Sequence, residues 1–132
     1  MSAPTDLIQQ IPLFASLSKR DVDTLARSFR DRTFPAGSEV TTEGQSGVGF
    51  FVIESGDATV SVGGQERRTL GPGDYFGELA LIDDSPRSAT IVADTPLKCW
   101  GLTSWEFRPL VESNAQIAWA MLQELAKRLR ES

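Results

Sequence analysis

Residues 50–74, FFVIESGDATVSVGGQERRTLGPGD, carry the pattern that decides the fold. Ala58, Val60 and Val62 lie on one side of an extended segment, with polar residues between them, as in a strand with one buried face. Gly63-Gly64 follows and is typical of a tight hairpin. Apolar runs and turns of this kind indicate a sandwich or barrel. The strands that the pattern predicts are Phe50–Glu54, Ala58–Val62, Arg67–Leu70, Ser88–Val92 and Leu97–Leu102.

Helical patterns flank this β region on both sides. Before it, Ser18 is a predicted N-cap, with Asp21 three residues on, of a helix that ends near Arg30. After it, Thr103 and Glu106 match a capping box, and a last helix starts near Asn114. The sequence therefore predicts a mainly β domain with helices at its two ends.

Length and composition exclude several classes of protein. The 132 residues make one domain, and 13 basic against 18 acidic residues give a net charge of −5. General nucleic-acid binding needs a dominant basic face, so we expect no nucleic-acid partner. The chain contains no histidine, which removes Ser-His and Cys-His catalysis and His-ligated zinc. No convincing acid–base pair replaces them, so we expect no enzyme, no metal and no cofactor.

Cysteine usage and the N-terminus bear on the compartment. Cys99 is the one cysteine and allows no internal disulfide, so no oxidising compartment is implied. The first ten residues, MSAPTDLIQQ, have neither the basic nor the apolar region of a signal peptide, and no apolar run is long enough for a membrane span. We expect a cytoplasmic protein. Cys99 also lies opposite Trp100 in its predicted strand, which favours a packing role.

Residues 76–90, FGELALIDDSPRSAT, contain the candidate anion site. Gly77 lets the backbone approach a ligand closely, and the N–H groups of residues 78–80 would begin a short helix, where an anion is favoured. Arg87 has the side chain that grips phosphate bidentately, and Ser88 adds a hydroxyl beside it.

Glu78 constrains what else the ligand carries. Its carboxylate repels phosphate, so within the same pocket it should face neutral hydroxyls such as those of a ribose. The segment therefore suits a ligand with one phosphate and one sugar hydroxyl close together. The alternative is that Arg87 pairs with Asp83 or Asp84 on the surface and no ligand site exists.

The stretch FGELALIDDSPRSAT resembles, at nearly every position, the phosphate-binding cassette of cyclic-nucleotide-binding domains. EGQSGVGFFVIESGDATV is similar to the hairpin that precedes the cassette in this family, LGPGDYFGE to its turn into the cassette, and IPLFASLSKRDVDTLA to its N-terminal helical segment. The resemblance implies an eight-stranded jelly-roll barrel, a double-stranded β-helix, with N-terminal and C-terminal helices. The expected single domain spans 1–132: a helical segment 1–30, a barrel 31–102 with the cassette at 76–90, and helices at 103–132.

The resemblance also implies the roles of individual residues. Glu78 would bond the ribose 2′-hydroxyl, and Arg87 would bond the cyclic phosphate, helped by Ser88 and by backbone amides. Leu79 and Val60 would line the sugar and base. The full set expected at the cyclic nucleotide is Val60, Arg68, Phe76, Gly77, Glu78, Leu79, Ala80, Arg87, Ser88 and Ala89.

Two residues bear on which nucleotide is bound. The family's cGMP sites usually have Thr where Ser88 stands, and SPRSAT is more similar to bacterial cAMP sites. Arg68 points the other way, because some cGMP sites place an Arg on this strand against guanine. We predict cAMP as the ligand, with cGMP as the alternative and a ligand-free interaction module of the same fold as a further one.

Members of this family do no chemistry on the nucleotide. Binding tightens the cassette against the barrel and lets the C-terminal helices swing in, so the resemblance implies a regulatory module. We expect no helix-turn-helix, kinase or channel segment after the last helix, so the output would pass to an effector protein in trans or to a missing downstream domain. The chain departs from the family at Gln45 and Val48, where acidic residues are common.

The last helix carries two apolar stripes. Ala118, Leu122, Leu125 and Leu129 follow heptad-like spacing, and Ile117 lies on a neighbouring stripe with Met121. One stripe would cover the barrel and the other could pair two protomers, giving a homodimer; the alternative is that both pack internally. Trp105 and Trp119, both in predicted helices, are expected in the core or in helix contacts.

Overall fold

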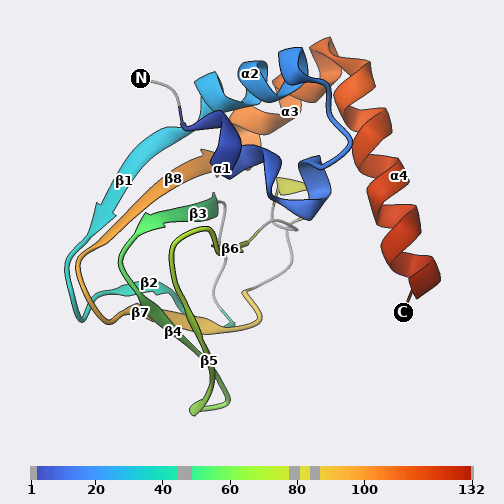
Figure 1. Ribbon diagram of the computed structural model, residues 1–132. Coiled ribbons are helices and arrows are strands. Elements are labelled where there is room, and N and C mark those ends of the chain that lie inside the picture. Colours follow the sequence, from blue (N-terminus) through green and yellow to red (C-terminus); the bar gives the residue numbers. More distant parts are fainter. Residues whose placement is uncertain (1–2, 45–48, 78–80, 84–86, 132) are drawn as a thin grey trace.

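The structure, a computed structural model, describes residues 3–44, 49–77, 81–83 and 87–131. Helices gather at one end of the molecule and two β-sheets at the other (Figure 1). The helices are α1 (Thr5–Gln9), the 3₁₀ helix η1 (Pro12–Phe14), α2 (Lys19–Ser28), α3 (Ser104–Ser113) and α4 (Ala115–Glu131). The strands are β1 (Arg30–Phe34), β2 (Glu39–Thr41), β3 (Gly49–Ser55), β4 (Ala58–Val62), β5 (Gln65–Leu70), β6 (Tyr75–Phe76), β7 (Thr90–Ala93) and β8 (Leu97–Thr103).

The eight strands form two four-stranded antiparallel sheets. The first, sheet A, has the order β1-β8-β3-β6, and the second, sheet B, has the order β2-β7-β4-β5. Strands distant in the sequence are neighbours in both sheets, as a jelly roll requires. The predicted eight-stranded fold with flanking helices is confirmed. Among the described residues, strand pairing does not join the two sheets into a closed barrel.

Sheet A lies between the helices and sheet B, and its strands β3 and β8 are buried on both faces, whereas β1 is largely exposed (Figure 1). Successive side chains of β3 and β8 point to opposite faces. Phe50 and Trp100 accordingly pack with the buried side chains of the helices, in a cluster that we call the helical core. Phe51 and Cys99 belong to a second cluster, the core between the sheets. The prediction that Cys99 and Trp100 lie on opposite faces of their strand is confirmed.

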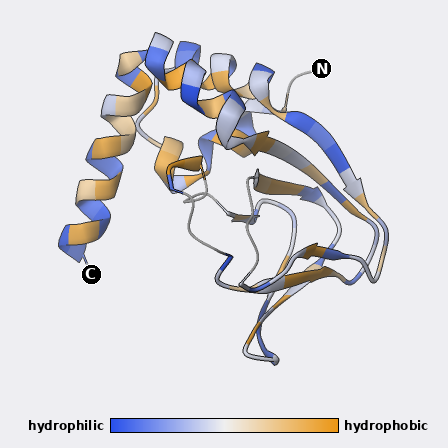
Figure 2. Ribbon diagram, turned by 180° about the vertical axis from the view of Figure 1, so that it is seen from behind, coloured by the Kyte–Doolittle hydropathy of each residue, from blue (hydrophilic) through white to orange (hydrophobic). Residues whose placement is uncertain are grey.

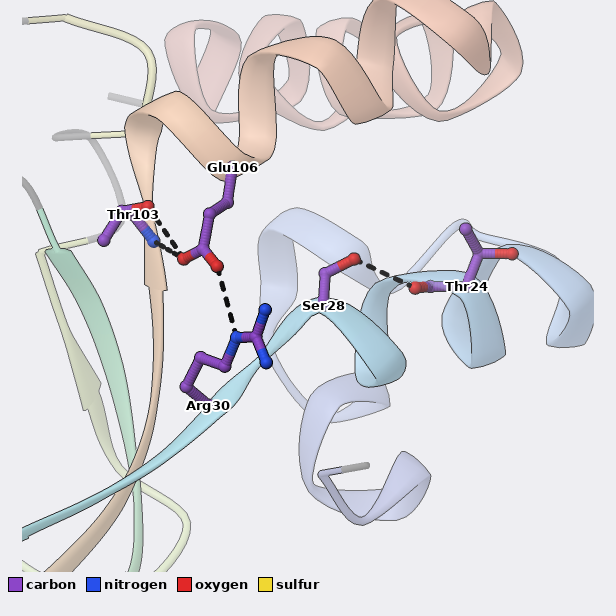
Figure 3. A network of polar contacts seen from close by, with 5 residues as sticks. All are labelled: Thr24, Ser28, Arg30, Thr103 and Glu106. Carbon is purple, nitrogen blue, oxygen red and sulfur yellow. Dashed lines mark hydrogen bonds and ion pairs between the residues drawn. The ribbon is translucent and has the colours of Figure 1, made fainter. Parts of the chain in front are cut away.

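Both predicted helix caps are confirmed. The Ser18 hydroxyl accepts a hydrogen bond of 3.2 Å from the Asp21 backbone N–H at the start of α2. At the start of α3, Glu106 accepts hydrogen bonds from the Thr103 N–H (3.2 Å) and hydroxyl (2.8 Å). Burial acts to raise the pKa of Glu106, but hydrogen bonds from Thr103 and Arg30 outweigh it and lower the pKa overall. Figure 3 shows how this carboxylate joins α3 to the start of β1 through Arg30.

The boundaries differ from the sequence prediction by two residues at three places, one of which is the strand predicted from Arg67, which begins at Gln65. The first predicted helix ends at Ser28, because the buried Phe29 adopts an extended backbone and Arg30 already starts β1. The strand predicted from Ser88 begins instead at Thr90. Here the carbonyl of Arg87 accepts from the Gly44 N–H and that of Ala89 from the Thr41 hydroxyl, so these carbonyls bond to the segment around β2 rather than within a ladder.

The prediction that the two helical tryptophans lie in the core is wrong. Trp105 and Trp119 are each 64% exposed. One stripe of α4 is buried, since Ile117 and Met121 lie in the helical core, but α4 packs mainly against η1 and α3 and not, as predicted, over the barrel. On the heptad-like stripe, Leu125 packs against the helical core, but Leu122 and Leu129 are 56% and 77% exposed, so these two side chains do not pack internally. Apolar residues recur along the whole of α4 (Figure 2).

The burial of Cys99 gives a direct prediction. Its side chain is fully buried, and burial raises the pKa of the thiol to about 12. Because the thiolate is the reactive form, a thiol reagent at pH 8 should leave the folded protein unlabelled and react with one thiol after denaturation. Labelling followed by mass spectrometry checks this. Rapid labelling of the folded protein would contradict the packing that places Cys99 between the sheets.

Candidate functional site

Arg87 is held at the end of β3 in an environment suited to an anion. Its Nη2 donates a hydrogen bond to the carbonyl oxygen of Gly49, the first residue of that strand. Its Nε is buried and has no hydrogen-bond partner among the described residues. Burial lowers the pKa of the guanidinium, yet arginine remains a cation at neutral pH. Arg87 is therefore a half-buried positive charge whose Nε–H is available to donate a further hydrogen bond.

Gly77 lies against Gly49 and Arg87, at a position where no other residue fits. Its backbone has φ = +81°, a conformation that favours glycine. A Cβ at this position would lie 2.6 Å from the Gly49 carbonyl oxygen and would collide with the Arg87 guanidinium. The sequence predicted that Gly77 allows a ligand to approach closely; the described neighbours that come this close are Gly49 and Arg87.

The predicted apolar residues lie between the sheets. Val60 and Phe76 are 6% and 8% exposed, belong to the core between the sheets, and have Ala89 packed against that core. Phe76 also packs against Phe51, with ring centroids 5.4 Å apart. These side chains therefore form an apolar wall contributed by β3, β4, β6 and the segment before β7.

Arg68 lies across from this wall on the edge strand β5. Its Cα partner on β4 is Val60, and directly opposed residues of antiparallel strands share a face of the sheet. Arg68 is exposed, as expected for a long cationic side chain on an edge strand. Its position places a guanidinium on the face of sheet B that Val60 occupies.

The remaining predicted site residues divide into two groups. Ser88 is described and exposed, next to Arg87. Glu78, Leu79 and Ala80 lie outside the described residues, so their assigned roles stay predictions. Asp84 also lies outside them, which leaves the pairing of Arg87 with that carboxylate as an alternative; the buried Nε favours an inward position of the side chain.

Gly49 was missed as part of the site by the sequence analysis. Its contribution is a backbone carbonyl, which no residue type announces. A signal was nevertheless present, because a glycine at the start of an apolar strand marks a close approach of another group. A Cβ at Gly49 would lie 2.9 Å from the Phe51 ring, so this residue also makes room for an aromatic side chain.

The described residues contain neither a candidate metal site nor a candidate membrane-spanning helix. Among the described ranges, no cluster of three His, Cys, Asp or Glu side chains is placed to hold a metal ion. Within the same ranges, no helix combines the length and apolar character needed to cross a bilayer.

Comparison with known proteins agrees with this geometry. The sequence profile of the cyclic nucleotide-binding domain family matches residues 31–114. A cAMP-dependent protein kinase regulatory subunit of Eremothecium gossypii is 41% identical over 107 residues, which cover 80% of this chain and 23% of that protein. A cGMP-dependent protein kinase of Eimeria tenella is 33% identical over 125 residues, covering 94% of this chain and 12% of that protein.

A solved structure extends the likeness to the whole fold. The N-terminal domain of a transcriptional regulator from Streptomyces coelicolor superposes with a TM-score of 0.89 at 29% identity, covering 96% of this chain and 92% of that domain. The chain thus spans less than a quarter of the two longer relatives but nearly all of this domain. On the profile match and the shared fold, the chain belongs to the cyclic nucleotide-binding domain family.

Proposed function

We propose that this domain is a non-catalytic sensor that binds cAMP, with Arg87 as the residue that holds the cyclic phosphate. The observation that carries the proposal is the half-buried Arg87 guanidinium, anchored on the Gly49 carbonyl with its Nε unpartnered among the described residues. A phosphate would supply both the missing acceptor and the compensating charge. No cofactor or metal is needed for this role.

The rest of the proposed ligand contacts divide by chemistry. The apolar wall of Val60, Phe76 and Ala89 suits the sugar and base. Ser88, the exposed neighbour of Arg87, is proposed to add a hydroxyl beside the phosphate. Glu78 is proposed to accept a hydrogen bond from the ribose 2′-hydroxyl, and Leu79 and Ala80 to complete the pocket. The cAMP-dependent kinase regulatory subunit among the relatives supports the choice of ligand.

The cGMP alternative rests on a specific side chain. Arg68 shares the face of sheet B with Val60, where a guanidinium could meet the acceptor atoms of guanine. A cGMP-dependent kinase is also among the relatives. If cGMP is the ligand, Arg68→Ala should weaken cGMP binding and leave cAMP binding unchanged, with Arg67→Ala as the matched control from the same strand.

The proposed output is a change in the position of α3 and α4 that an effector protein or a further domain detects. A cytoplasmic location suits such a sensor. The exposed stripe containing Leu122 and Leu129 supports a second copy of the chain as one partner. Sedimentation of the wild type and of Leu122→Glu would decide this: a dimer that dissociates in the variant supports the pairing, and a monomeric wild type contradicts it.

Isothermal titration calorimetry with cAMP and cGMP in parallel tests the proposed function. The protein should first be unfolded and refolded to remove any ligand carried through purification. Binding of one nucleotide in preference to the other supports the sensor and identifies its ligand. No binding of either contradicts the proposal and leaves the interaction module of the same fold.

The role proposed for Glu78 has its own test. Glu78→Gln keeps the shape of the side chain but replaces a charge-assisted hydrogen bond by a neutral one, and should weaken cAMP binding by about 1–2 kcal/mol. In the wild type, 2′-deoxy-cAMP should show a comparable loss, measured by the same titration. Equal binding of cAMP and its 2′-deoxy analogue would contradict the assignment of Glu78.

A further inference from the structure

Two polar side-chain contacts join α4 to the N-terminal helical segment. The Gln116 amide donates to the Asp21 carboxylate on α2, with Nε2 and Oδ1 3.1 Å apart. The Ser16 hydroxyl, between η1 and α2, donates to the Glu124 carboxylate, with Oγ and Oε1 2.5 Å apart. These contacts span 95 and 108 residues of sequence, so they form only when the two ends of the chain come together.

The first contact involves an unusually buried charge. Asp21 is 7% exposed, and a charged side chain that is buried requires a hydrogen-bonding partner. Its backbone N–H is already fixed by the Ser18 cap, so the carboxylate is held in place by the first turn of α2. Gln116, in the first turn of α4, is thereby tied to a rigid acceptor.

The second contact lies further along the same helix. Gln116 and Glu124 are eight residues apart, which corresponds to about 12 Å along a helix axis. Between them, Ile117, Ala120 and Met121 pack into the helical core. The apolar contacts give α4 its affinity for the N-terminal segment, and the two polar pairs restrict its direction. The C-terminal end of α4 lies well apart from both sheets (Figure 1).

We infer that the pairs Asp21–Gln116 and Ser16–Glu124 form a polar latch that holds α4 on η1 and α2 and opposes its movement toward the nucleotide site. This inference rests on the proposed function, because it assigns the latch to the helix whose movement reports binding. The latch then sets the apparent affinity: a ligand that needs the released helix binds more weakly by the fraction of molecules in which the helix is released.

The first test needs no ligand and uses hydrogen exchange of the α4 amides in the full chain. A single hydrogen bond contributes about 1 kcal/mol, so Glu124→Ala and Gln116→Ala should each speed exchange of these amides by about fivefold. Gln123→Ala is the matched control, since it places the same alanine at the exposed neighbour of Glu124. Adding Ser16→Ala to Glu124→Ala should cause little further change, because both remove the same bond.

A conservative variant separates the latch from general damage to the fold. Asp21→Asn keeps an acceptor for Gln116 and should exchange more slowly than Gln116→Ala, close to the wild type. Unchanged exchange in both Gln116→Ala and Glu124→Ala would overturn the latch. So would equal acceleration by Gln123→Ala, because the effect would then be that of any alanine on this helix.

The second test is cAMP titration of the same variants. Release of the latch should tighten binding by up to about fivefold in Glu124→Ala and leave Gln123→Ala at the wild-type affinity. Faster exchange with unchanged or weaker binding would overturn the regulatory role and leave only a structural contact. If the wild type binds no cyclic nucleotide, the proposed function fails and the link to binding fails with it, while the exchange result still decides whether the latch holds α4.

Discussion

Arg87→Ala is expected to weaken cAMP binding by about 2–5 kcal/mol, the largest loss of any single substitution in the proposed site. The phosphate would lose a half-buried cation whose Nε has no other partner among the described residues. Its charge would then be desolvated without compensation. Titration calorimetry of the refolded protein measures the change directly, and wild-type affinity in the variant would contradict the assignment.

Two comparisons make this result specific. Arg87→Lys keeps the positive charge but lacks the planar fork, so it should recover only part of the affinity. Arg32→Ala removes an equal charge from the exposed face of β1 and should leave binding within experimental error. If all three variants weakened binding equally, the effect would reflect net charge rather than a contact at Arg87.

Phe50→Ala should have the largest effect on folding, lowering the free energy of unfolding by about 3–5 kcal/mol. The side chain is completely buried where the helices meet sheet A. Its ring makes edge-to-face contacts with Phe14 and Phe29, at centroid distances of 6.0 and 5.9 Å, and with Tyr75 at 6.1 Å. Truncation leaves a cavity among rings that come from η1, the end of α2 and β6.

Denaturant unfolding followed by circular dichroism measures this loss. Trp105→Ala is the matched control, because it removes a larger aromatic side chain that is 64% exposed and should change stability by less than about 0.5 kcal/mol. A loss at Trp105 as large as that at Phe50 would contradict the observed burial of the two residues. It would instead favour the position in the core or in helix contacts that the helical pattern predicts for Trp105.

Much of the fold could be predicted because its signals are local. The alternation of Ala58 and Val60 with polar residues, the cap at Ser18 and the capping box at Thr103 depend on neighbours a few positions away. A strand period or a helix cap is a property of adjacent dihedral angles and short side-chain hydrogen bonds, so it is visible in the sequence. The assignment of Cys99 and Trp100 to opposite faces follows from the same rule.

The resemblance of residues 76–90 to a known cassette implied both the fold and the family, which the local patterns by themselves could not. It also named the candidate site, of which Arg87 and Gly77 are found side by side. The roles of Glu78, Leu79 and Ala80 stay predictions, since these residues lie outside the described part of the chain.

Only the tertiary structure decided which residues that are distant in the sequence contact one another. The sequence by itself determined a mainly β domain with capped helices and, between its strands, a segment that contains Gly77 and Arg87. It could not show that Arg87 rests on the carbonyl of Gly49, 38 residues away, or that Gln116 reaches Asp21. It misplaced Trp105 and Trp119, since a helical period shows which side chains share a face but not whether another element covers that face. Coverage and long-range pairing depend on how all the layers pack, and that is fixed only when the whole chain has folded.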